Sequence, residues 1–214
     1  MLEYSSGAYK DIQSTKVNQQ IYTIHDKRID VQCYVRVIGK KFYITFRGTD
    51  SLKDWLTNFQ FWKKPIPYKD PQVRVHTGFI NAYSNEVKGK IHKLITEDSE
   101  EIIISGHSYG AALAILCAED LQNSFPQKNY EVFLFGSPRV GNKAFKELYD
   151  KRIFRTFRIS NGNDIISKIP FRFMGYRHVG IAINIGFPRI LGLFSLKNHK
   201  LSEYYASILK SYLQ

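Results

Sequence analysis

A single serine, Ser108, lies between two glycines in the stretch IIISGHSYGAALAI at residues 102–115. Gly106 and Gly110 complete a G-x-S-x-G motif, with an apolar strand-like run before it and an alanine-rich helix-like run after it. A sharp strand-to-helix turn lifts a serine hydroxyl above the sheet edge, where it can act as a nucleophile. The helix would also direct its N–H groups and positive dipole end at a developing oxyanion. The motif therefore predicts a nucleophile elbow at Ser108.

A nucleophilic serine needs a base, and the base needs a group that orients it. Asp164 follows the strand-like run 154–160 in a loop rich in Gly and Asn, which suits an acid at the sheet edge. Two histidines come after Ser108 in the chain, His178 and His199. His178 lies inside an apolar strand-like run, as buried structural histidines do, whereas His199 follows SLKN and opens the last helix. We favour His199 as the base. No spacing of His, Cys or carboxylates indicates a metal site, and the chemistry needs no cofactor.

The order of elements indicates an α/β fold. Residues 30–46 are predicted to form a β-hairpin turning at Gly39, and residues 79–95 have the apolar spacing of one helix. Further strands are predicted at 100–105, 130–136, 154–160 and 176–185, and further helices at 109–125, 142–152 and 202–213. Strands that alternate with helices favour a mostly parallel sheet with helices packed on it. We expect one domain across residues 1–214.

The composition limits the class of protein. The chain has 214 residues, 43% of them hydrophobic, with 31 Lys or Arg against 19 Asp or Glu and a net charge of +12. The basic residues are scattered, and either a solvated basic surface or a patch for anionic partners fits them. Cys33 and Cys117 have apolar neighbours, which favours two buried free thiols. The N-terminus lacks the basic and apolar regions of a signal peptide, so we expect an intracellular protein, with peripheral membrane contact left open.

Six blocks of the chain resemble class 3 lipases, the fungal-type triacylglycerol lipases, in the order that this family shows. The blocks are FRGTDSLKDW, HTGF, GHSYGAALA, FGSPRVGN, NGNDIISKIP and NHKLSEYY, and they span roughly residues 20–210. The resemblance implies an α/β-hydrolase fold: a central, mostly parallel sheet flanked by helices, with a short lid-like helix. It implies Ser108 as nucleophile, Asp164 as acid and His199 as base, in agreement with the reasoning from residue types. It further implies that Thr49 and Tyr109 form the oxyanion hole.

The segment after FRGT has an apolar face of its own. Leu52, Trp55, Leu56 and Phe59 fall at i, i+3, i+4 and i+7, so a helix here would be amphipathic. Such a helix either packs on the core or, as in relatives of the family, forms a lid over the active site. Under the second interpretation its apolar face is substrate-facing.

These observations favour a serine carboxylic-ester hydrolase that acts on lipid esters, chiefly acylglycerols, through an acyl-enzyme intermediate. The alternatives are a phospholipase or acyltransferase with the same triad, or a lipase-like protein that only binds lipid. The positive charge makes peripheral contact with an anionic membrane or a lipid-droplet surface an expectation. Nucleic acid is not expected as a partner, because the chain has no recognised nucleic-acid motif or clustered basic stripe.

Overall fold

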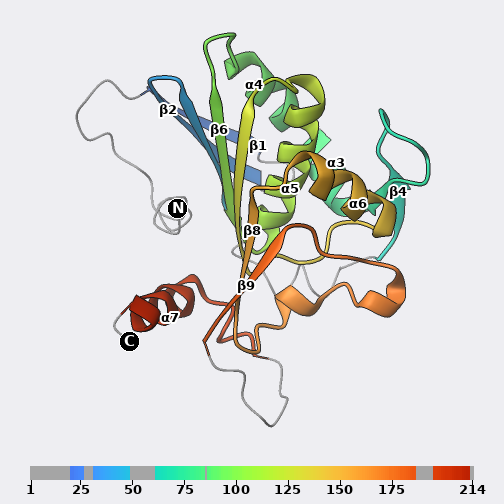
Figure 1. The fold of residues 1–214 in the computed structure, drawn as a ribbon, viewed down its shortest axis with the longest axis vertical. Helices are drawn as coiled ribbons and strands as arrows, with labels where there is room; N and C mark the ends of the chain where they lie inside the picture. The colour runs from blue at the N-terminus through green and yellow to red at the C-terminus, as the bar shows by residue number, and fades with distance from the viewer. Residues whose placement is uncertain (1–19, 27–30, 49–60, 85, 187–194, 213–214) are drawn as a thin grey trace.

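The computed structural model describes residues 20–26, 31–48, 61–84, 86–186 and 195–212. Nine strands and five α-helices are found in this part of the chain (Figure 1). The strands are β1 (Gln20–Asp26), β2 (Val31–Ile38), β3 (Lys41–Phe46), β4 (Lys63–Pro65), β5 (Arg74–His76), β6 (Glu101–His107), β7 (Asn129–Phe135), β8 (Thr156–Asn161) and β9 (Ile181–Ile185). The helices are α3 (Thr77–Ser84), α4 (Glu86–Leu94), α5 (Tyr109–Ser124), α6 (Lys143–Arg152) and α7 (Leu201–Tyr212), and the short 3-10 helices are η1 (Ile166–Lys168) and η2 (Arg172–Met174).

Seven of the strands form one sheet in the order β1-β2-β3-β6-β7-β8-β9, and β4 and β5 pair separately. β2 is antiparallel to both β1 and β3, and the tight turn at Gly39 reverses the chain between β2 and β3. From β3 to β9 every neighbouring pair is parallel, and helices connect β6 to β7 and β7 to β8. The mostly parallel sheet flanked by helices that the sequence predicted is thus confirmed.

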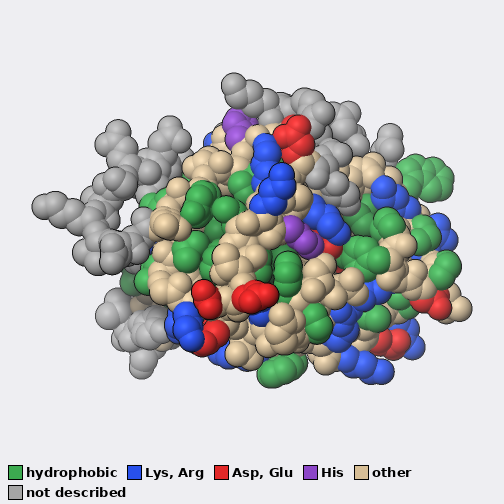
Figure 2. All heavy atoms as spheres, turned by 90° about the horizontal axis from the view of Figure 1, so that it is seen from above, with side chains coloured by type: hydrophobic (Ala, Val, Ile, Leu, Met, Phe, Trp, Pro, Cys, Tyr) green, Lys and Arg blue, Asp and Glu red, His purple; other side chains and the backbone are tan. Residues whose placement is uncertain are grey.

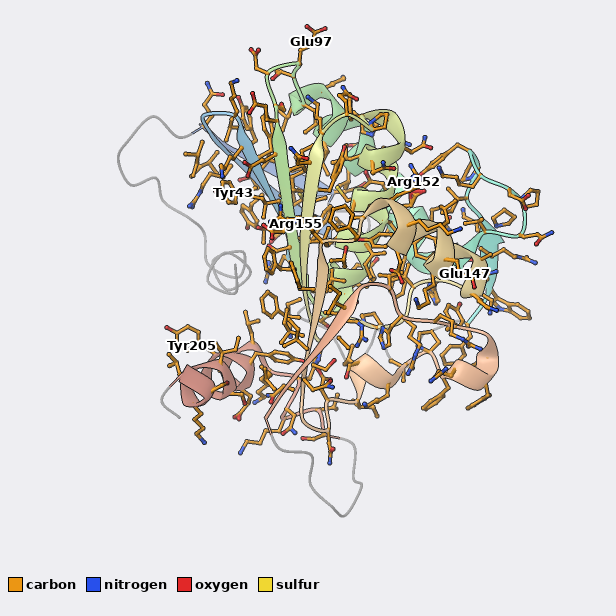
Figure 3. All side chains as sticks on the ribbon, in the orientation of Figure 1. Tyr43, Glu97, Glu147, Arg152, Arg155 and Tyr205 are labelled. Atoms are coloured by element: carbon orange, nitrogen blue, oxygen red, sulfur yellow. The ribbon has the colours of Figure 1, made fainter. Side chains whose placement is uncertain are left out.

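The core lies mainly on the face of the sheet that α3, α4, α5 and α6 cover, whereas α7 lies on the other face (Figure 1). The alternation along β7 shows both faces. Val132 and Leu134 point into the main core, and Phe133 and Phe135 point toward α7, where they pack near Tyr204. In Figure 3, Glu147 and Arg152 of α6 mark the first face and Tyr205 of α7 the second.

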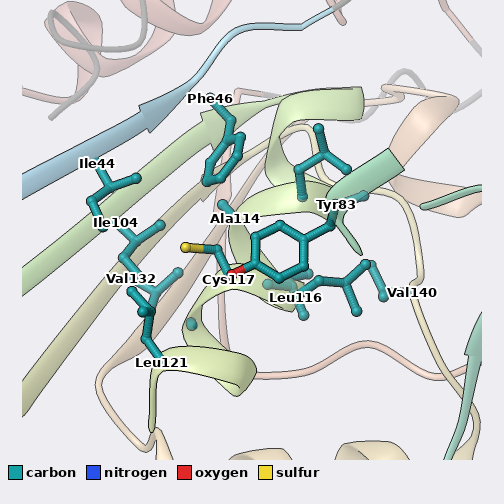
Figure 4. Close-up of a cluster of buried hydrophobic side chains, with 14 of the residues drawn as sticks. Ile44, Phe46, Tyr83, Ile104, Ala114, Leu116, Cys117, Leu121, Val132 and Val140 are labelled. Atoms are coloured by element: carbon teal, nitrogen blue, oxygen red, sulfur yellow. The ribbon is translucent and has the colours of Figure 1, made fainter. Parts of the chain in front are cut away.

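Helix α5 is buried along almost its whole length. Figure 4 shows its small side chains, among them Ala114 and Cys117, against Ile44, Ile104 and Val132 of the three central strands. Alanines at this contact let the helix approach the sheet closely, which fixes the position of its N-terminus. The site at that N-terminus therefore rests on a rigid element.

Two predicted elements differ in their bounds. The segment predicted as one helix over 79–95 contains two helices, α3 and α4, and its apolar residues Ile80, Tyr83, Val87 and Ile91 are all buried in the main core, as their spacing predicted. The strand predicted over 176–185 is shorter: β9 begins at Ile181, and His178 lies before it. His199 does not open the last helix but lies in the turn before Leu201, where α7 begins.

The structure also bears on the expectations about the cysteines, the basic surface and membrane-spanning helices. Cys33 and Cys117 are free and buried, as predicted. Figure 2 views the end of the molecule where the parallel strands begin, and its basic side chains are interspersed with acidic and hydrophobic ones. Among the described helices, none is long and apolar enough to cross a bilayer. The single domain over 1–214 stays a prediction.

Candidate active site

Ser108 occupies the turn between β6 and α5, as the motif predicted. Its backbone has φ 58° and ψ −125°, and no other non-glycine residue in the described segments has a positive φ. A non-glycine residue is held there only when the surrounding structure enforces it, and such strain is concentrated at functional sites. The strand, the strained serine and the helix together form a nucleophile elbow.

Gly106 and Gly110 make this turn sterically feasible. A Cβ on Gly106 would lie 2.4 Å from the carbonyl oxygen of Gly110, and a Cβ on Gly110 would lie 2.5 Å from the carbonyl oxygen of Phe46. Backbone occupies both spaces, so neither position can accept a side chain without moving a strand or the helix. The two glycines of the motif are therefore needed because β3, β6 and α5 approach one another so closely.

The hydroxyl of Ser108 is buried and unbonded in the described structure. Ser108 is 2% exposed, and its Oγ has no hydrogen-bond partner among the described residues. It precedes α5 as the N-cap, yet its side chain makes no capping bond to the helix N–H groups. Its own N–H donates to the carbonyl oxygen of Phe135 at 2.9 Å. The backbone thus fixes the position of Ser108, and no hydrogen bond to a described residue occupies its hydroxyl.

Asp164 and His199 form a buried pair. Nδ1 of His199 lies 2.9 Å from Oδ2 and 3.0 Å from Oδ1 of Asp164, and both residues are almost inaccessible to solvent. Burial opposes the charge on Asp164, but hydrogen bonds from His199, from Tyr204 and from the N–H of Ile166 outweigh it and lower its pKa. The carboxylate therefore stays ionised and fixes the imidazole with Nε2 pointing away from it.

Tyr204 supports this carboxylate and was not identified from the sequence as part of the site. Its hydroxyl donates to Oδ2 of Asp164 at 2.6 Å and accepts the N–H of Asn161 at 3.1 Å. The apolar spacing of the last helix marked Tyr204 only as a core residue. Its sequence signal was the block NHKLSEYY, which places a tyrosine five residues after His199.

His107 stacks against the ring of His199, and it was not identified from the sequence as a site residue either. The two rings stack with centroids 4.6 Å apart, and Nε2 of His107 lies 2.8 Å from the carbonyl oxygen of His199. Burial, followed by the proximity of His199, lowers the pKa of His107 to about 3. The ring is therefore neutral and can donate its Nε2–H to the carbonyl.

Ser108 and the Asp164–His199 pair both lie beside the end of β7, at Phe135 and Gly136 respectively. Phe135 accepts the N–H of Ser108, and a Cβ on Gly136 would lie 2.8 Å from both Oδ2 of Asp164 and Cε1 of His199. Nε2 of His199, like the Oγ of Ser108, is buried without a hydrogen-bond partner in the described segments. The two atoms share one region but are not bonded to each other here. Catalytic hydrogen bonds are often long in unliganded enzymes and tighten with substrate.

The remaining predicted residues divide into those described and those not. Tyr109 is the first residue of α5, which places its N–H at the helix N-terminus, and its ring lies 5.7 Å from that of Phe79. Thr49 and the predicted lid residues lie outside the described residues: Leu52, Trp55, Leu56 and Phe59.

His178, the alternative base, lies elsewhere. Its Nε2 is 2.8 Å from the carbonyl oxygen of Ser167, and burial together with Arg158 and Arg139 holds its pKa well below the ordinary value. Asp164 is bonded to His199 instead. No group of three metal-ligating side chains occurs in the described part of the chain.

A mostly parallel sheet with a strained serine after a central strand defines the α/β-hydrolase class. Comparison with known proteins narrows this class. Residues 43–174 match the family model of class 3 lipases. This chain therefore belongs to the class 3 lipase family. The matched range includes Ser108 and Asp164 and ends before His199.

Individual relatives carry several lipid-hydrolase names. The chain is 30% identical over 145 residues to a secreted mono- and diacylglycerol lipase of Fusarium solani, covering 65% of this chain and 42% of that protein. It is 32% identical over 147 residues to the chloroplastic phospholipase A(1) DAD1 of Arabidopsis thaliana, covering 59% and 33%. The chain thus spans less than half the length of these curated relatives.

Solved structures show the same fold. The triacylglyceride lipase of Rhizomucor miehei superposes with a TM-score of 0.70 at 28% identity, covering 78% of this chain and 67% of that one. A triacylglycerol lipase whose catalytic centre is described as a serine protease triad gives a TM-score of 0.75 at 26% identity, covering 85% and 79%.

Proposed function

We propose that this protein is a serine carboxylic-ester hydrolase that acts on lipid esters. The observation that carries the proposal is that two buried atoms, the Oγ of Ser108 and Nε2 of His199, have no hydrogen-bond partner among the described residues, while Asp164 bonds to the other nitrogen of the imidazole. A buried polar group without a partner is costly, and such groups are retained where a reaction needs them. Membership of a family whose relatives are named lipases supports the same conclusion.

In the proposed reaction, Nε2 of His199 takes the proton of Ser108 as the Oγ attacks the ester carbonyl carbon. The carbonyl oxygen becomes an oxyanion, and the proposed donor that stabilises it is the N–H of Tyr109, the first residue of α5. When the tetrahedral intermediate collapses, the C–O bond breaks and the alcohol leaves with the proton from His199. Water, deprotonated by His199, then attacks the acyl-serine; the bond to the Oγ breaks, His199 returns the proton to the Oγ, and the carboxylic acid leaves.

Asp164 acts through His199 in this scheme. Its ionised carboxylate selects the tautomer with a proton on Nδ1 and stabilises the imidazolium that forms during each proton transfer. The proposed role of Thr49 as a second oxyanion donor follows from the family resemblance alone. Substrate binding would bring Ser108 and His199 into hydrogen-bonding range.

The class of ester is proposed as acylglycerol. One of the relatives reported above is named for mono- and diacylglycerols, which supports this choice. A phospholipid ester is the second candidate, because another relative is named phospholipase A(1) and the net charge of +12 would favour an anionic lipid surface. An acyltransferase would use the same acyl-serine with an alcohol in place of water, and a lipid-binding protein would not turn over at all.

The test is a hydrolysis panel with mono-, di- and triacylglycerols and phospholipids, each measured below and above the concentration at which it forms an interface. Ser108→Ala should lower turnover by several orders of magnitude, because it removes the nucleophile. Ser124→Ala, an exposed serine at the other end of α5, is the matched control and should keep wild-type rates. Equal rates in the two variants would refute the assignment, and no turnover by the wild type on any ester would favour a lipid-binding protein.

A further inference from the structure

Two exposed phenylalanines flank an arginine on η2. Phe173 is 86% exposed, and its ring stacks on that of Phe171 with centroids 5.4 Å apart. Arg172, between them in the sequence, is exposed as well. Apolar side chains grouped at a surface mark interaction sites, because they are better accommodated against another apolar phase than in water. The segment thus presents an apolar tip with a positive charge.

A second aromatic segment lies beside this tip. Trp62, just before β4, is 74% exposed, and the hydroxyl of Tyr176 donates to the carbonyl oxygen of Phe61 at 3.1 Å. Lys63 donates to the carbonyl oxygen of Met174 at 2.7 Å, and its Nζ lies 4.1 Å from the centre of the Tyr176 ring. In Figure 1 the orange segment that carries η2 lies below β4. We call the two joined segments, residues 61–65 and 171–177, the aromatic–basic surface.

Positive charge accumulates around this surface. Residues 61–78 contain four Lys or Arg and a single acidic residue, and residues 165–180 contain three Lys or Arg and no acidic residue. Within the described segments, no ion pair involves Arg172 or Arg177. Burial, followed by the nearby guanidinium groups of Arg158, Arg172 and Arg177, lowers the pKa of Arg139 to about 10. Of the basic residues counted here, Lys69 is paired with Glu119 at 3.4 Å, whereas the charges of Arg172 and Arg177 are not offset by an ion pair within the described segments.

A chain of aromatic contacts links the aromatic–basic surface to the candidate active site. The ring of Tyr109 lies 5.7 Å from that of Phe79, which lies 4.4 Å from that of His76. The ring of His76 lies 6.3 Å from that of Tyr176, which is bonded to the backbone of Phe61. The surface is thus only a few side chains away from the residue that follows Ser108.

We propose that the aromatic–basic surface docks the protein onto an anionic phospholipid bilayer. Phe173 and Trp62 would enter the headgroup region, while Arg172 contacts lipid phosphates. The phosphate backbone of duplex DNA would also attract the basic residues, but it offers no apolar phase for a protruding phenylalanine. Docking brings the site close to lipid esters and in that respect rests on the proposed function, although binding is measurable without turnover.

The test is flotation of the full chain with vesicles made of ether-linked lipids, which an esterase cannot cleave. One set contains phosphatidylcholine alone, and the other contains phosphatidylcholine with phosphatidylglycerol. We expect at least tenfold tighter binding to the anionic vesicles, about fivefold weaker binding for Arg172→Gln and about tenfold weaker binding for Phe173→Ser. Both side chains are exposed, so the unfolding midpoint should stay unchanged.

Phe154→Ser is the matched control. Phe154 is 70% exposed and precedes an exposed arginine, but Arg155 is paired with Glu131 at 2.7 Å, and the segment lies where β8 begins. This variant should bind within twofold of the wild type. Equal binding to both vesicle types, wild-type binding by Phe173→Ser and Arg172→Gln, or a loss confined to binding of a duplex DNA oligonucleotide would overturn the proposal. Hydrolysis of a water-soluble ester on the same preparations tests the proposed function separately.

Discussion

The charge on Asp164 depends on a hydroxyl from α7. Tyr204 donates to Oδ2 at 2.6 Å and at the same time accepts the N–H of Asn161, so it joins the helix, the carboxylate and the end of β8. A hydrogen bond to a charged group contributes more than one between neutral groups, about 1.5–3 kcal/mol. Tyr204 is therefore a positioning residue that acts on the reaction through Asp164 and His199.

Tyr204→Phe should lower kcat for a soluble ester by about tenfold or more, because the hydroxyl that bonds to Asp164 is lost. KM should change little, because the phenylalanine ring still fills the space of the tyrosine ring. Losing this donor raises the pKa of Asp164, so the acid limb of the pH–rate profile should move to higher pH. Tyr205→Phe, an exposed neighbour on the same helix, is the control and should change neither value. If Tyr204→Phe loses only stability and keeps the wild-type pH–rate profile, Tyr204 has a structural role and does not act on the reaction.

The proposed triad residues could be predicted from the sequence because each has a local signal: the glycine motif, the loop after a strand and the position before the last helix. Tyr204, Asn161 and His107 lie in blocks that resemble the family, but no residue type or spacing of their own marked them as site residues. Their roles depend on hydrogen bonds that only the tertiary fold creates: Tyr204 to Asp164, His107 to the carbonyl oxygen of His199, and the N–H of Asn161 to Tyr204. A buried tyrosine on an amphipathic helix is indistinguishable from a core residue until its hydroxyl has a partner.

Among the elements, the elbow shows most directly why the site needs its glycines. Gly110 lies in the first turn of α5 against the carbonyl groups of Phe46 and Arg47 at the end of β3. Nothing there can rotate away, because the neighbouring atoms are backbone. By contrast, Gly89 in α4 has open space where a Cβ would be.

Gly110→Ala should destabilise the fold by about 3 kcal/mol or more, since a Cβ at 2.5 Å from backbone forces strand and helix apart. Gly89→Ala should be neutral or stabilise by up to about 1 kcal/mol, because alanine is the better helix former. Denaturant unfolding of both variants measures this. Equal stabilities would contradict the close approach of α5 and β3.

Several elements with a clear local pattern were predicted well, but the long pattern over 79–95 contains two helices, and β1, β4 and β5 were not predicted. The hairpin, α5, β7 and α6 all follow their patterns closely. Strands β4 and β5 have three residues each and contain too few positions for any periodicity, so only their pairing defines them. The predicted lid, residues 52–59, lies outside the described residues, and its role stays a prediction.

The stability of the whole molecule should depend on buried histidines. His107 has a pKa of about 3 in the folded protein against an ordinary value of 6.5. Between these values the unfolded chain binds a proton that the folded chain does not, so stability is full above pH 6.5 and falls as the pH is lowered toward 3. The slope from one such group is about 1.4 kcal/mol per pH unit.

His107→Gln should remove this slope while its amide still donates to the carbonyl oxygen of His199. The free energy of unfolding, measured from pH 6.5 to pH 4, should therefore fall less steeply in the variant than in the wild type. Asp164 titrates below this range because its pKa is lowered, and His178 contributes equally to both proteins. Parallel curves would show that His107 is protonated in the folded state.

At this scale, composition predicted a basic protein with two buried thiols, and both features are found. It could not show that positive charge gathers near exposed rings, because residues 61–65 and 171–177 are more than a hundred residues apart. The hydrogen bonds of Tyr176 and Lys63, which the sequence does not show, bring these segments together.

The central claim is that Ser108 is a nucleophile activated by His199, and covalent labelling with a fluorophosphonate tests it most directly. Intact mass should show one adduct per chain, and peptide mapping should place it on Ser108. The labelling rate should fall by at least about a hundredfold in His199→Asn, and Ser108→Ala should not be labelled. A folded wild-type chain that forms no adduct, or forms one on another serine, would contradict the account.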